Sequence, residues 1–135
     1  MDPTKLLSVL LSWAVQLTSY PHPHILPVIE YKNNDFFVQY ACNGKRNCRV
    51  AAWYNNDGII NINNVLKDQT DPMTRGIIVH ELVHYLQDLS GKFDNKDCQD
   101  QQVREREAYA IQRAYLHTVA GAFIAIYMDF PPCPG

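Results

Sequence analysis

Two histidines and a glutamate in the middle of the chain have the types and spacing of a metal-dependent hydrolytic site. They are His80, Glu81 and His84, within the sequence His-Glu-Leu-Val-His. On an α-helix, residues four apart point in the same direction, so both imidazoles can bind one metal ion. Glu81 then lies beside the open coordination position, where a carboxylate can act as a general base on water.

The segment around these residues predicts the helix that must hold them. Asp71 is a good N-cap, Pro72 suits the first helical position, and Gly91 suits a left-handed stop. Apolar residues recur at helical spacing on one side, namely Ile78, Val79, Leu82, Val83, Leu86 and Leu89. We therefore expect a helix between Asp71 and Gly91 that packs on one face and presents its chemical residues on the other.

A third ligand must come from another segment, because a catalytic zinc site normally has three protein ligands. A second long helix is predicted to start at about Asp100, and it carries Glu105 and Glu107. The two glutamates point roughly 200° apart on a helix, so they cannot both face the metal. Apolar spacing favours Glu107, which lies four residues from both Val103 and Ile111.

The polar partner that orients a metal ligand favours Glu105 instead. Tyr109 lies one helical turn after Glu105 and has a hydroxyl group that can orient a ligating carboxylate, whereas the residue one turn after Glu107 is apolar. The small Ala108 also lets two helices approach closely.

The two motifs together resemble a known group. His80-Glu81-Leu82-Val83-His84 followed by Glu105-x-x-Ala108-Tyr109 resembles the gluzincin branch of the zincin metallopeptidases, in which the later glutamate binds zinc. This chain has Tyr109 where many gluzincins have aspartate. The order of an opening helix, a hairpin and the two motifs is similar to a family of small, largely uncharacterised bacterial zincin-like proteins.

The resemblance implies zinc held by His80, His84 and Glu105, with Glu107 as the fallback. It implies a peptidase in which a zinc-activated water, with Glu81 as general base, cleaves a peptide or protein substrate. Candidates for stabilising the transition state are Tyr85, Tyr109, Tyr115 and His117. The alternative is a secreted zinc-binding or effector module with a structural or non-hydrolytic metal site, which would have no need of Glu81.

The remaining segments predict an α+β fold of one domain over residues 1–135, a minimal zincin-like domain. Residues 5–19 read as an amphipathic N-terminal helix, and the two histidines of residues 21–27 as part of a solvated connector. Strands are expected at Val28–Tyr31, Phe36–Ala41, Arg49–Tyr54 and Ile59–Asn63. They predict a small, mostly antiparallel sheet of three or four strands, whose Arg49–Asn63 hairpin is the candidate edge for an extended substrate.

Composition narrows the function classes. Twelve basic and 14 acidic residues give a net charge of -2 in 135 residues, which argues against a nucleic-acid binder. No apolar run is long enough to span a membrane. Four cysteines in a small chain favour an oxidising compartment, so we expect a secreted or periplasmic protein from which an export signal has been removed.

The four cysteines allow three pairings, and fully reduced thiols are the alternative. Cys42 and Cys48 flank a short, turn-rich loop, so a bridge between them is favoured, which leaves Cys98 for Cys133. A continuous helix over residues 100–128 would hold the second pair too far apart, so we expect a helix break at Gly121.

Overall fold

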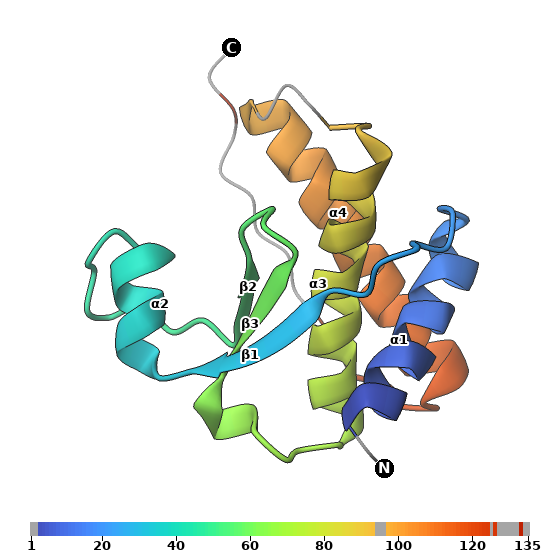
Figure 1. Cartoon of the computed structure of the whole chain (residues 1–135), viewed down its shortest axis with the longest axis horizontal. Coiled ribbons are helices and arrows are strands. Elements are labelled where there is room, and N and C mark those ends of the chain that lie inside the picture. Colours follow the sequence, from blue (N-terminus) through green and yellow to red (C-terminus); the bar gives the residue numbers. More distant parts are fainter. Residues whose placement is uncertain (1–2, 94–96, 125, 127–132, 134–135) are drawn as a thin grey trace.

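The computed structural model describes residues 3–93, 97–124, 126 and 133. These residues form four α-helices and a three-stranded sheet, which confirms the α+β class. Helix α3 (Pro72–Ser90) stands between the sheet on one side and α1 (Pro3–Thr18) on the other (Figure 1). Helix α4 (Cys98–Ala114) packs against both α3 and α1. The central helix is the one that carries the His-Glu-x-x-His sequence.

The predicted ends of α3 are confirmed. The Asp71 carboxylate accepts hydrogen bonds from the Thr74 hydroxyl at 2.7 Å and the Thr74 backbone N–H at 3.4 Å. Pro72 is the first helical residue, and Gly91 follows the last with a positive φ of 68°. A residue in this left-handed conformation ends a helix, and glycine adopts it without steric cost.

The prediction that only one face of α3 packs is wrong. Every residue from Ile78 to Gln87 is buried, including the two histidines and Glu81. The helix contacts α1, α4 and β2 from different sides, so its polar residues are enclosed as well. Leu89, which was assigned to the packed face, lies in the last turn and is 56% exposed.

The hydrophobic core lies where α1 and α3 meet. Its residues from α1 are Leu7, Leu10, Leu11 and Ala14, and they pack with Ile78, Leu82 and Leu86 of α3. The π-helical turn η2 (Tyr115–Val119) closes the core with two buried side chains. Leu116 of this turn comes so close to α3 that a Cβ at Gly76 would lie 3.1 Å from its Cδ2, so the glycine permits the close packing.

The sheet is mixed, where the sequence predicted mostly antiparallel pairing. Strands β2 (Ala52–Tyr54) and β3 (Ile59–Asn63) form the expected antiparallel hairpin. Strand β1 (Val28–Lys32), however, pairs parallel to β3, in the order β1-β3-β2. The edge strand β2 faces α3, so the hairpin lies beside the helix that carries His80 and His84, as expected.

The predicted strand Phe36–Ala41 is wrong, and its correction explains the parallel pair. Phe36–Tyr40 belong to helix α2 (Asn34–Tyr40), and Ala41 is its C-cap. Asn33 caps the helix by accepting a hydrogen bond from the Phe36 backbone N–H at 3.0 Å, and Phe36 stacks on Tyr40 one turn later. Capping and aromatic contacts at helical spacing outweigh β propensity here. Because this segment is a helix and not a strand, only β2 lies between β1 and β3 in the order of strands along the chain. The chain therefore reverses twice, and β1 and β3 run in the same direction.

Helix α4 and the segment after it confirm the predicted break. Asp97 caps α4 by accepting a hydrogen bond from the Asp100 backbone N–H at 2.8 Å. The helix ends at Ala114, η2 follows, and Gly121 has a φ of 65°. Disulfides join Cys42 to Cys48 and Cys98 to Cys133, as the sequence favoured.

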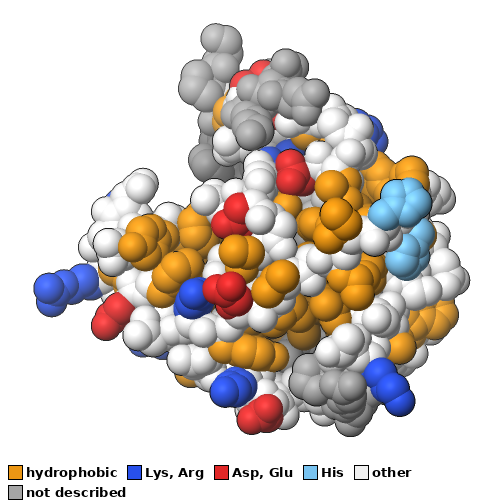
Figure 2. Space-filling view, viewed as in Figure 1, with side chains coloured by type: hydrophobic (Ala, Val, Ile, Leu, Met, Phe, Trp, Pro, Cys, Tyr) orange, Lys and Arg blue, Asp and Glu red, His pale blue; other side chains and the backbone are white. Residues whose placement is uncertain are grey.

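The two histidines of the connector between α1 and β1 are exposed, as predicted. His22 and His24 lie on the surface, and Figure 2 shows histidine side chains at the margin of the molecule over this connector. Within the described residues, no helix is long and apolar enough to cross a membrane.

Candidate metal centre

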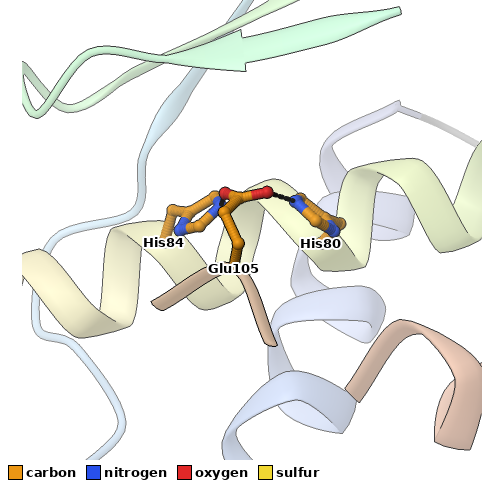
Figure 3. Close-up of side chains that lie close together, drawn as sticks. All are labelled: His80, His84 and Glu105. Carbon is orange, nitrogen blue, oxygen red and sulfur yellow. Dashed lines mark ion pairs between the residues drawn. The ribbon is translucent and has the colours of Figure 1, made fainter. Parts of the chain in front are cut away.

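His80, His84 and Glu105 form a cluster between α3 and α4. The Nε2 atom of His84 lies 2.5 Å from Glu105 Oε1, and the Nε2 atom of His80 lies 3.5 Å from Glu105 Oε2. Figure 3 shows both imidazoles turned toward this carboxylate. One ligand atom from each residue lies within 4.8 Å of the others, so the three can hold a metal ion. The structure therefore brings together the three residues that the sequence predicted as ligands.

The other ring nitrogen of each histidine contacts a buried glutamine. His80 Nδ1 lies 2.9 Å from Gln112 Oε1, and His84 Nδ1 lies 2.8 Å from Gln87 Oε1. The two glutamines are 5% and 1% exposed. An amide oxygen only accepts hydrogen bonds, so each Nδ1 carries the proton and donates it. Each Nε2 then keeps a free lone pair, which is the state a metal ligand requires.

The amide of Gln87 is itself held in this orientation. Its Nε2 donates to the Arg104 backbone carbonyl at 3.0 Å and to Glu107 Oε1 at 2.9 Å. Its oxygen therefore points to His84. The same Glu107 oxygen accepts a hydrogen bond from the Tyr20 hydroxyl at 2.6 Å, which connects the end of α1 to the cluster. Glu107, the fallback ligand, thus faces Gln87 and Tyr20 and lies outside the cluster.

Glu81 lies beside the cluster and is 7% exposed. Burial raises the pKa of its carboxyl group, while the two histidines and the Tyr54 backbone N–H oppose that shift in part. The net effect is a carboxyl group that takes up a proton more readily than one in water.

The charges of the cluster favour a cation between its members. Burial by itself would raise the pKa of Glu105, but its close contacts with the imidazole groups of His80 and His84 hold that pKa well below its ordinary value. Burial by itself would lower the pKa of His84, but Glu105 and Glu81 raise it. Two imidazole nitrogens and a carboxylate are also the donor set of a three-ligand catalytic zinc site. The residues present therefore fit a bound metal ion.

A cavity of about 430 Å³ opens next to the cluster. Its walls include all three residues of β2, the side chains of Glu81 and the cluster, and Arg104 and Tyr109 of α4. Glu81 and the cluster therefore line one cavity, with an edge strand as one wall.

Tyr109, which was expected to orient Glu105, contacts a histidine of the cluster. Its ring packs edge to face on His80, with centroids 4.4 Å apart. Of the four residues named as transition-state candidates, Tyr109 is the one that lines this cavity. Tyr85 donates its hydroxyl proton to the Ile25 carbonyl, Tyr115 is in the core, and the His117 ring packs on Phe123.

Sequence reasoning missed the residues that support the histidines. Gln87 lies three residues after His84 on the same helix, a spacing at which side chains meet. Gln112 comes from another helix. Its one sequence signal was that it is a polar residue on the same side of α4 as Glu105. Tyr20, 87 residues from Glu107, gave no local signal.

Comparisons with protein-family models, with curated proteins and with solved structures find no match to this chain. The resemblance to gluzincins therefore rests on the motifs and on the cluster that they form.

Proposed function

We propose that this protein is a zinc-dependent metallohydrolase that cleaves peptide bonds. The observation that carries the proposal is the position of Glu81, which shares a cavity with a cluster of two histidines and a glutamate. A metal site that only tied helices together would need neither a cavity nor a further buried carboxyl group.

The roles of the residues follow from their positions. Zinc at this donor set would supply Lewis-acid chemistry, activating water as a nucleophile and polarising a carbonyl group. Glu81 accepts the proton of the attacking water on its carboxylate and passes it to the leaving amine. Its raised pKa supports the first role, because a carboxylate with a higher pKa is a stronger base and takes up the proton of water more readily.

The sheet supports an extended peptide as the substrate. Strand β2 is the edge strand nearest the cluster and lines the cavity along its whole length. A peptide lying in the cavity can add to this edge through main-chain hydrogen bonds, the mode known as β-augmentation. The disulfides support a secreted or periplasmic protein acting on substrates in an oxidising compartment.

The proposal is tested first by metal content. We expect elemental analysis of the purified protein to find one zinc per chain, and removal of zinc by a chelator to lower the melting temperature. Protein without stoichiometric metal and without a gain in stability from added zinc would contradict the site.

The catalytic step is tested with Glu81→Gln on a library of unstructured peptides. We expect this variant to keep its zinc and to lose activity by about 10²- to 10⁴-fold, the usual contribution of a general base. Glu30→Gln is the matched control, because Glu30 pairs with Lys32 on β1 and does not line the cavity. Hydrolysis that survives unchanged in Glu81→Gln would refute Glu81 as the general base, and zinc-loaded wild type that cleaves nothing would favour a non-hydrolytic metal module.

A further inference from the structure

Arg104 lies in the cavity beside the metal cluster. It precedes Glu105 on α4, and its side chain forms part of the cavity wall. Its Nε donates to Gln87 Oε1 and its Nη2 to Asn56 Oδ1, both at 3.4 Å. The guanidinium group therefore spans from the His84 end of the cluster to the turn between β2 and β3.

The partners of this guanidinium group are neutral. Both acceptors are side-chain amide oxygens, and both hydrogen bonds are long. The ion pairs found among residues 3–93, 97–124, 126 and 133 do not include Arg104. Its positive charge is thus satisfied by dipoles and remains able to attract an anion.

The charge balance of the cavity points to a substrate anion. A divalent cation at the cluster would balance the two carboxylates, Glu81 and Glu105, so Arg104 would leave the cavity with a net positive charge. Arginine binds carboxylates through two parallel hydrogen bonds, which are stronger than bonds to neutral amides. An incoming carboxylate would therefore replace Gln87 and Asn56 as the preferred partner.

We propose that Arg104 is a specificity-determining residue that binds a carboxylate group of the substrate close to the bond that is cut. This proposal rests on the proposed peptidase function. The carboxylate is either an acidic side chain or a free C-terminus, and both offer the same chemistry to the guanidinium group. Arg104 binds the substrate on the His84 side of the cluster, where β2 runs into its turn.

Assays with a series of peptide substrates distinguish the two sources of the carboxylate. Starting from any peptide that the enzyme cleaves, Glu, Gln or Lys is placed in turn at each position flanking the cut, and the C-terminus is free or amidated. We expect a preference of roughly tenfold to 100-fold in kcat/KM for the carboxylate form over its amide. A preference for Glu over Gln identifies a side chain, and a preference for the free terminus identifies a C-terminal carboxylate. Equal rates for all forms overturn the proposal.

Assays with two variants test whether that preference depends on Arg104. In Arg104→Gln we expect KM for the carboxylate substrates to rise by the same factor, with kcat and the neutral substrates little changed. Arg106→Gln removes an equal charge from the exposed side of the same helix, where Arg106 donates to Gln102 Oε1, so it should keep the preference. Zinc content is measured in each variant, because Arg104 also contacts Gln87. An unchanged preference in zinc-loaded Arg104→Gln overturns the proposal.

A binding measurement separates this proposal from the peptidase function. Trp53 lines the cavity, so peptide binding can be followed by tryptophan fluorescence in zinc-loaded Glu81→Gln, which we expect to turn over substrate too slowly to disturb the measurement. We expect Glu peptides to bind tenfold to 100-fold more tightly than Gln peptides, and Arg104→Gln in this background to remove the difference. This result would support Arg104 even if no hydrolysis were found, whereas cleavage without any carboxylate preference would leave the function standing and refute Arg104.

Discussion

Glu105 and Glu107 lie two residues apart on α4, yet they face different parts of the protein. Glu105 contacts both histidine Nε2 atoms, whereas Glu107 accepts hydrogen bonds from Tyr20 and Gln87. Because the two side chains are separated by roughly 200° around the helix, Glu105 points to the cluster and Glu107 points to the hydrogen bonds behind it. Glu107 thus acts on His84 through Gln87.

Substitution of the two glutamates should distinguish these roles. Glu105→Gln removes one of the three proposed ligands, so we expect it to abolish stoichiometric zinc binding. Glu107→Gln weakens the support of Gln87, so we expect it to lower zinc affinity by about 10- to 100-fold, the usual effect of losing a group that orients a ligand. Both affinities are measured by competition with a chelator, with Glu30→Gln as the control. If Glu107→Gln loses zinc and Glu105→Gln keeps it, the two roles are exchanged.

At the scale of the element, local sequence signals determine the ends of α3, and packing determines which of its residues are buried. The carboxylate of Asp71 and the left-handed Gly91 fix where the helix begins and ends. The contacts with α1, α4 and β2 bury its chemical residues, which an amphipathic pattern alone did not predict. Helix α2 likewise depends on both, because the Asn33 cap and the burial of Phe37 override a β-like composition.

The N-cap of α3 should contribute to the loss of folding stability at acidic pH. Hydrogen bonds from Thr74 hold the pKa of the Asp71 carboxyl group below its ordinary value. Because the folded pKa is the lower one, the charged cap stabilises the fold above about pH 4, and this contribution disappears as the pH falls through the folded pKa. Asp71→Asn keeps an oxygen acceptor but does not titrate. We expect its urea midpoint to fall less than that of the wild type between about pH 6 and pH 2. Parallel curves for the two proteins would refute this role.

At the scale of the whole molecule, the cluster depends on three segments from distant parts of the chain. Helix α3 supplies the histidines, α4 supplies Glu105 and Gln112, and the segment that follows α1 supplies Tyr20. The disulfide between Cys98 and Cys133 ties the first residue of α4 to the C-terminal segment.

The two disulfides should contribute unequally to stability. The Cys98–Cys133 bridge closes a sequence separation of 35 residues and the Cys42–Cys48 bridge one of 6. Loop entropy in the unfolded chain then gives about 4 kcal/mol for the first and about 2 kcal/mol for the second. We expect the Cys98→Ser, Cys133→Ser double variant to unfold at lower urea concentration than the Cys42→Ser, Cys48→Ser variant. The reverse order would show that native contacts around the short loop outweigh chain entropy.

The sequence by itself determined the parts of this protein that depend on local spacing. Helical periodicity placed His80, Glu81 and His84 together, capping residues set the limits of α3, and the Asn-Asp-Gly turn set the β2–β3 hairpin. These features depend on interactions between residues a few positions apart, which a linear pattern displays directly.

Only the tertiary structure decided the rest. Apolar spacing and orienting partners gave opposite answers for Glu105 and Glu107, and the way α4 docks on α3 settled which one faces the histidines. The parallel pairing of β1 with β3 and the contacts of Gln112 and Tyr20 likewise join residues far apart in the chain. Such contacts are set by how whole elements pack, because burial and hydrogen bonding between distant segments leave no periodic trace in either segment alone.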